Sequence, residues 1–276
     1  MIENYSELML ESQRYQLIIF LKRLESVYKE LQNGLPKINF EGELPRKKYR
    51  FNKESENDIV AIYLKAVKVV STLNACMSLH KSGYTQEIGV LCRVIEDLCN
   101  EILFLMKPGD GIDLSNDQKN FLSYFYQEEF SSLDDLINNH LDRPTLSSKK
   151  IRAAVARLTA SIINISDAQT ISKITHKTLS GYVHGAYPQI MELFGGNPPN
   201  FHLSGMLNTP RVYECIAQLI EYVNRFILLT CLIIKKMDYV KLDSIMLNIR
   251  NEFEAYFLTK SGLTPAEMLA RARKAG

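Results

Sequence analysis

The sequence predicts an all-α protein, a multi-helix bundle. Apolar residues recur at helical spacing over long segments, and no run alternates with period two for long enough to demand a sheet. Turn-forming groups of Gly, Pro and Asn separate these segments. With 276 residues, 46% of them hydrophobic, the chain is not disordered as a whole. It can bury a substantial core, in one large helical domain or in two smaller ones.

Four helices are predicted in the first half of the chain. Each has apolar residues at helical spacing, and ends such as Asn33-Gly34 and Lys107-Pro108-Gly109 are typical helix stops. The connection 34–53 contains Gly34, Pro36, Gly42 and Pro45 and is predicted to be non-helical. The four helices cover 3–33, 55–81, 86–106 and 115–139.

The second half is predicted to add a short basic helix, a histidine-bearing helix, a long apolar helix and two C-terminal helices. The histidine-bearing helix is expected to bend near Gly181 or Pro188 and to stop at the Gly- and Pro-rich run 195–199. Thr209 is the expected N-cap of the long apolar helix, with Pro210 in its first turn. These helices cover 146–164, 167–194, 209–236, 238–258 and 264–274.

We expect the core of the bundle to span 54–236. An N-terminal helix and a basic linker (1–53) precede it, and C-terminal helices (237–276) follow it. Both ends of the chain either pack on this core or mediate association.

Charge and cysteine content exclude several classes of protein. A net charge of +2 rules out a strongly basic nucleic-acid coat protein but permits a local basic patch. The five cysteines form no CxxC pair, and their odd number fits free thiols in a reducing compartment.

Glu3, Glu7 and Glu11 precede the first short apolar run, which is the wrong charge order for an export signal. Charged residues interrupt the best membrane candidate, 216–234, so we expect a cytoplasmic protein without a membrane span.

The helix over 86–106 carries Arg93 and Glu96 on the side opposite its broad apolar arc. That side is only partly polar, because Val90 and Phe104 lie near it, so we expect other elements to cover both faces. Partly buried charges must be paired. Arg93 and Glu96 therefore either form an ion pair that supports the fold, or Arg93 binds a phosphate with its planar fork while Glu96 orients it.

The segment 176–194 contains the residues best suited to proton transfer and to close approach of a substrate or another helix. His184 can accept and donate protons near neutral pH, and its small neighbours would let another helix or a substrate approach its ring. Lys177 lies two turns earlier on the same face, Ser180 lies one turn earlier, and His176 points elsewhere. From spacing alone, His184 is either a hydrogen-bonded packing residue or a proton-transfer group. No histidine or carboxylate spacing indicates a metal site, and no cofactor is expected.

The run 177–187, KTLSGYVHGAY, resembles the signature of the HEPN superfamily (higher eukaryotes and prokaryotes nucleotide-binding). Helical-bundle domains of that family carry an arginine, a short spacer and a histidine, often followed by a small residue and an aromatic one. The segments RVIEDLCNEILFL (93–105) and LSGYVHGAY (179–187) are also similar to an uncharacterised bacterial helical family related to it. Lys177 stands where many HEPN ribonucleases have arginine, and lysine binds phosphate only as a point charge.

The resemblance implies a HEPN-like core within 54–236 and, in active members, metal-independent RNA cleavage. In that scheme His184 transfers protons at the ribose 2′-hydroxyl or the leaving oxygen, and a cation stabilises the charged phosphorane. Either Lys177 supplies this cation, or Arg93 supplies it from the other helix beside Glu96, or the protein is a non-catalytic member.

The expected function is accordingly a HEPN-like ribonuclease effector of the toxin or phage-defence type. The alternative is a non-catalytic helical module that binds a nucleotide or a protein partner, and an antitoxin would be one such partner. HEPN domains commonly pair, so we expect a homodimer. Three strongly apolar segments favour it because they exceed what one bundle obviously needs: Leu17–Leu21, Phe226–Ile234 and Tyr256–Leu258. In the other interpretation these segments pack internally and the protein is a monomer.

Basic and aromatic residues interleave at 46–51, RKKYRF, a pattern suited to phosphate contact combined with base stacking. The same pattern is typical of a solvated linker. A second basic cluster falls on the helix over 146–164 and consists of Lys149, Lys150, Arg152 and Arg157. The RNA-binding candidates are Tyr187, Arg46, Lys47, Lys48 and Arg50.

Overall fold

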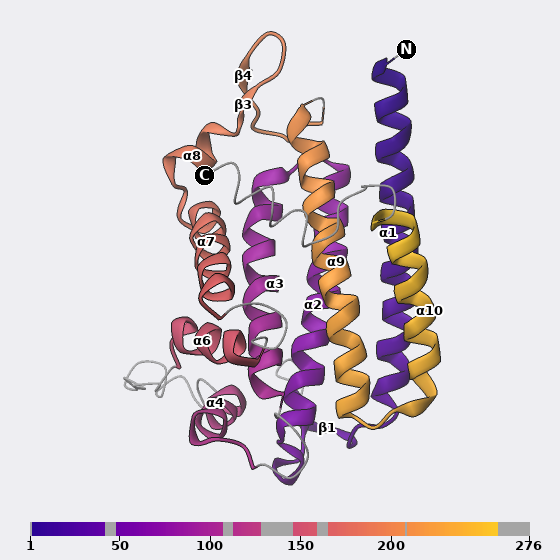
Figure 1. Cartoon of the computed structure of the whole chain (residues 1–276), viewed down its shortest axis with the longest axis vertical. Helices are drawn as coiled ribbons and strands as arrows, with labels where there is room; N and C mark the ends of the chain where they lie inside the picture. The colour runs from indigo at the N-terminus through magenta and orange to yellow at the C-terminus, as the bar shows by residue number, and fades with distance from the viewer. Residues whose placement is uncertain are drawn as a thin grey trace.

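Long helices form the body of the protein in the computed structural model, which confirms the all-α bundle (Figure 1). The structure describes residues 2–41, 48–106, 113–127, 146–158, 165–207 and 209–258. The long helices are α1 (Ile2–Gln32), α2 (Asp58–Lys81), α3 (Thr85–Leu105), α7 (Ile165–His184) and α9 (Pro210–Lys236).

Shorter helices and two small hairpins complete the described part of the chain. The short helical segments are η1 (Lys53–Ser55), α4 (Asn116–Tyr126), α6 (Ser148–Leu158), α8 (Tyr187–Met191), η2 (Val240–Leu242), α10 (Asp243–Phe253) and η3 (Glu254–Leu258). The hairpins pair β1 (Ile38–Glu41) with β2 (Lys48–Phe51), and β3 (Phe194–Gly195) with β4 (Asn200–Phe201). The parts of the predicted helices that fall on 128–139, 159–164 and 264–274 lie outside the described residues.

Helix α3 occupies a central position in the bundle. It packs against α2 and α9 on one side and against α6 and α7 on the other (Figure 1). Helix α10 lies against α1 and α9, and the two hairpins lie at opposite ends of the bundle. Because α3 is covered on both sides, Arg93 and Glu96 are largely enclosed between helices, as the sequence pattern predicted.

One buried apolar cluster runs from α1 through α10. Leu21, Leu73, Ile95, Phe226 and Phe253 are all at most 1% exposed and belong to it. Residues before position 54 and after position 236 therefore pack on the same core as the middle of the chain. The apolar segments expected to exceed the needs of the bundle are used largely inside it.

Both α2 and α9 are long and apolar enough to cross a membrane by length and composition alone. In the bundle each of them buries more than half of its most apolar window against other helices. This is how the core helices of a soluble protein behave, so the two helices are only a weak indication of a membrane span.

The helix expected over 167–194 is two helices. α7 ends at His184, and Gly185 then adopts a left-handed conformation with φ 60°. The Ala186 amide donates to the Gly181 carbonyl at 2.9 Å, which is the capping bond of a helix that ends in a left-handed glycine. The break therefore falls at Gly185, and not at Gly181 or Pro188 as the sequence suggested.

The structure adds detail to two other local expectations. Thr209 is the N-cap residue of α9 and Pro210 lies in its first turn, as expected, but the Thr209 hydroxyl donates backward to the Met206 carbonyl at 2.9 Å and makes no side-chain capping bond. The connection 34–53 includes the antiparallel β1–β2 hairpin, in which Ile38 lies opposite Phe51 and Phe40 opposite Tyr49. Each strand has only four residues, which is too short for a period-two pattern to stand out in the sequence.

Candidate functional site

Tyr182 determines how closely α7 lies on α3. Gly89 of α3 has no side chain at the contact, and a Cβ there would lie only 2.6 Å from the Tyr182 ring. The Tyr182 hydroxyl donates to Glu192 at 2.8 Å, and Arg211 of α9 contacts both of these residues. Burial, together with the hydrogen bond to Glu192, raises the pKa of Tyr182. Tyr182 thus holds α7 against α3 and α9.

Farther along α3 and α7, basic side chains from three helices lie close together. We call Arg93 of α3, Arg152 of α6 and His176 of α7 the basic cluster. The Arg152 guanidinium donates from Nη1 to His176 Nδ1 at 2.9 Å. Because arginine can only donate, Nδ1 accepts and His176 is held in its neutral form.

The members of the basic cluster disfavour one another's positive charge. Burial lowers the pKa of His176, and the charges of Arg93 and Arg152 lower it further. Burial and the charge of Arg93 likewise lower the pKa of Arg152, although Asp97 opposes the shift. All three cluster residues are partly exposed, but the Arg93 side chain is only 13% exposed and its Nη1 atom is buried.

The expected Arg93–Glu96 ion pair is wrong, because each residue has a different partner. Glu96 is 4% exposed and pairs through Oε2 with Arg225 of α9 at 2.6 Å, while Asn100 donates to its other oxygen at 3.1 Å. Arg93 pairs instead with Asp97, one turn farther along α3. Helix α9 covers α3 at the position of Glu96, and it supplies a cation 129 residues away in sequence.

The Glu96 carboxylate favours the charged form of the Arg225 guanidinium. Burial disfavours the charge of the guanidinium, but the adjacent Glu96 carboxylate outweighs this and raises the pKa of Arg225. Its side chain keeps 45% of its exposure and lies over the Tyr222 ring, 5.7 Å from the centroid. Glu96 is therefore committed to Arg225, and its role of orienting Arg93 is not supported.

Lys177 and His184 lie on the exposed side of α7. Within the described part of the chain, neither side chain forms a hydrogen bond or an ion pair, so the structure does not join them to Arg93 or Glu96. The small residues near His184 are used differently from the expectation: Gly185 ends α7, and a Cβ at Gly181 would lie 2.5 Å from the Gln189 side chain. They let α8 fold back against α7.

The RNA-binding candidates do not form one site with the basic cluster. Tyr187 is 77% exposed at the start of α8. Arg46 and Lys47 lie outside the described residues; Lys48 and Arg50 are in strand β2, where Arg50 is exposed.

Other features of the described residues offer no reactive centre. No group of three or more histidine, cysteine or acidic side chains there is placed to hold a metal ion. Cys76, Cys92, Cys99 and Cys215 are buried free thiols, and burial raises the pKa of Cys99 and Cys215 to about 12. Such thiols are unreactive, because the thiolate is the nucleophile.

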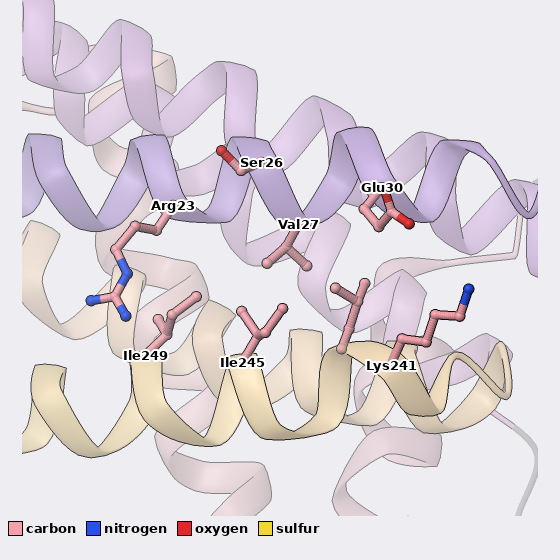
Figure 2. Close-up of a pocket in the computed structure, with 8 residues that line it drawn as sticks. Arg23, Ser26, Val27, Glu30, Lys241, Ile245 and Ile249 are labelled. Atoms are coloured by element: carbon pink, nitrogen blue, oxygen red, sulfur yellow. The ribbon is translucent and has the colours of Figure 1, made fainter.

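A groove of about 410 Å³ lies between α1 and α10, away from the helices that carry the basic cluster. Figure 2 shows Val27 of α1 facing Ile245 and Ile249 of α10 across it. Arg23 at its edge is already paired with Glu252, at 2.5 Å. The groove is mainly apolar and presents no cluster of chemical groups.

No protein-family model, no curated protein and no solved structure matches this chain. The fold and the site describe this protein as a helical bundle with a partly exposed basic cluster between α3, α6 and α7.

Sequence reasoning missed the pairing of Arg152 with His176. The sequence shows both the basic helix over 146–164 and His176, but nothing in it places α6 beside α7. Leu179, which is buried, lies one turn after His176 and marks the edge of the buried face of α7. That position was the available signal that His176 faces a neighbouring helix.

Proposed function

We propose that this protein binds the phosphate of a nucleotide or of RNA at the basic cluster. The observation that carries the proposal is that Arg152, hydrogen-bonded to His176, lies near Arg93, so two guanidinium groups share the one carboxylate that pairs with Arg93. Glu96 is used by Arg225, so Asp97 is the one acidic group paired with the cluster among the described residues. A bound phosphate would relieve this repulsion, and guanidinium forks suit phosphate oxygens.

Neighbouring cations favour an extended ligand over free phosphate. Lys149 and Lys150 are exposed on α6, and Lys177 and His184 are exposed on α7. These groups offer further charge around the cluster without being tied to it. A nucleotide or an RNA strand carries phosphates and sugars beyond the first anion and can use them.

Calorimetric titration with ADP, a 5′-phosphorylated RNA oligonucleotide and inorganic phosphate tests the proposal. We expect Arg152→Gln to weaken ADP and RNA binding about tenfold or more, because it removes a charge-assisted donor. The matched control is Lys22→Gln, an exposed cation of α1, a helix that carries no part of the cluster; it should change the affinity by less than about threefold. Equal affinities of wild type and Arg152→Gln, or no binding of any probe at low salt, would contradict the proposal.

Metal-independent RNA cleavage of the HEPN kind is the second candidate function. The observation that favours it is that Lys177 and His184 are both exposed on α7 and not engaged in hydrogen bonds or ion pairs with described residues. Incubation with mixed RNA in excess chelator separates the two candidates: cleavage lost in His184→Ala supports a ribonuclease effector, and intact RNA supports a binding module.

A further inference from the structure

The β1–β2 hairpin carries a pair of aromatic side chains that are exposed to solvent. Phe40 and Tyr49 lie directly opposite each other, with ring centroids 5.1 Å apart and planes inclined by 50°. Phe51, on the same face at the base of the hairpin, is 8% exposed and belongs to the protein interior. Exposure then rises outward, to 45% for Phe40 and 76% for Tyr49. The outer ring therefore presents much of its surface to solvent.

The hairpin segment also concentrates positive charge. The described residues of this segment, 37–41 and 48–53, contain four lysines and arginines and one glutamate, a net charge of +3, whereas the whole chain carries +2. The remainder of the chain is therefore net negative. A positive segment of this kind on an otherwise acidic chain attracts polyanions to one place.

We propose that the β1–β2 hairpin is a single-stranded nucleic-acid binding site in which an unpaired base stacks on Tyr49. An exposed ring backed by a second ring, next to lysines and arginines, combines the two interactions that such sites use: stacking on the base and attraction of the phosphates. Duplexes cannot use the ring, because their bases are already stacked. The site is separate from the basic cluster and does not rest on it.

The absence of tryptophan from the chain makes a direct test available. Tyr49→Trp introduces a single tryptophan at the proposed stacking position. We expect its fluorescence to be quenched by oligo(rU) or oligo(dT) strands of about ten nucleotides and not by a duplex of the same length. The two strands distinguish RNA from DNA as the preferred source. The matched control is Tyr15→Trp, at a position 65% exposed on α1, which should not be quenched.

Affinity measured with a labelled oligonucleotide gives a second readout without tryptophan. Tyr49→Ala should weaken binding about tenfold, and Tyr49→Phe, which keeps the ring and the hairpin, should bind like wild type. Arg152→Gln should leave quenching at Tyr49→Trp unchanged, so failure of the phosphate site and failure of this site are distinguishable. Three results would overturn the proposal: no quenching at low salt, equal quenching by duplex, or a change in tryptophan emission that follows protein concentration and so reports a protein contact.

Discussion

Glu96 shows how the fold deals with a charge inside the bundle. Its carboxylate is 4% exposed, and it is satisfied by Arg225 from α9 and by Asn100 from its own helix. Removing one partner of a buried pair leaves an uncompensated charge, which costs more than the pair itself contributes. Sequence analysis correctly indicated that charges on this helix must be paired. It named the wrong partner for Glu96, because proximity along one helix says nothing about a cation contributed by α9.

We predict that Arg225→Leu lowers the free energy of unfolding by about 2 kcal/mol, below the range for fully buried pairs because Arg225 keeps contact with solvent. The double variant Glu96→Leu/Arg225→Leu should recover most of this loss, since no buried charge is left alone. Chemical denaturation measures both. Arg23→Leu, which breaks the more exposed pair with Glu252, is the control and should cost less than about 1 kcal/mol. A double variant no more stable than Arg225→Leu would contradict this interpretation.

At the scale of elements, His80 joins three helices. It is 0% exposed near the end of α2, accepts a hydrogen bond at Nδ1 from Arg14 Nε of α1 at 2.9 Å, and donates from Nε2 to the Val212 carbonyl of α9 at 2.9 Å. This pattern requires the neutral ring, because a protonated Nδ1 cannot accept. Burial lowers the pKa of His80, and the charge of Arg14 adds to the effect despite the bond to Val212.

The pH dependence of stability follows from this arrangement. The unfolded chain protonates His80 first as the pH falls, so the stabilisation is complete above the unfolded pKa of about 6.5 and is lost as the pH falls toward the lower folded value. We predict that the free energy of unfolding decreases below about pH 6.5 and that His80→Gln, less stable at neutral pH, shows a shallower decrease. Urea denaturation at several pH values measures it. Parallel curves for the two proteins would show that His80 is not the group responsible.

The elements themselves were predictable to different degrees. Helices α2, α3 and α9 begin and end within a few residues of the predicted bounds, because amphipathic patterns and Gly or Pro stops are local signals. The division of α7 from α8 depends on Gly185 taking the left-handed conformation, whereas the sequence pattern indicated a bend near Gly181 or Pro188. The basic cluster could not be predicted, because it depends on tertiary packing of α6 beside α7.

At the scale of the whole molecule, the apolar content is accounted for within one chain. Leu21, Phe226 and Phe253 are buried in a common core, so the surplus that favoured a homodimer is small. The dimer stays a prediction that rests on the HEPN resemblance. The two proposed sites lie apart: the basic cluster lies where α3, α6 and α7 meet, and the positive hairpin lies at one end of the bundle (Figure 1).

The pKa of His176, followed by NMR of its imidazole ring with and without ADP, tests the phosphate site most directly. In the free protein we predict a value below the usual 6.5, because burial and the two arginines disfavour the protonated ring. Bound phosphate should raise the pKa, since its negative charge favours protonation, and Arg152→Gln should reduce that rise. His80, which is hydrogen-bonded to α1 and α9 and belongs to neither proposed site, serves as the internal reference. A His176 pKa that does not change at saturating ADP would contradict a phosphate site at the basic cluster.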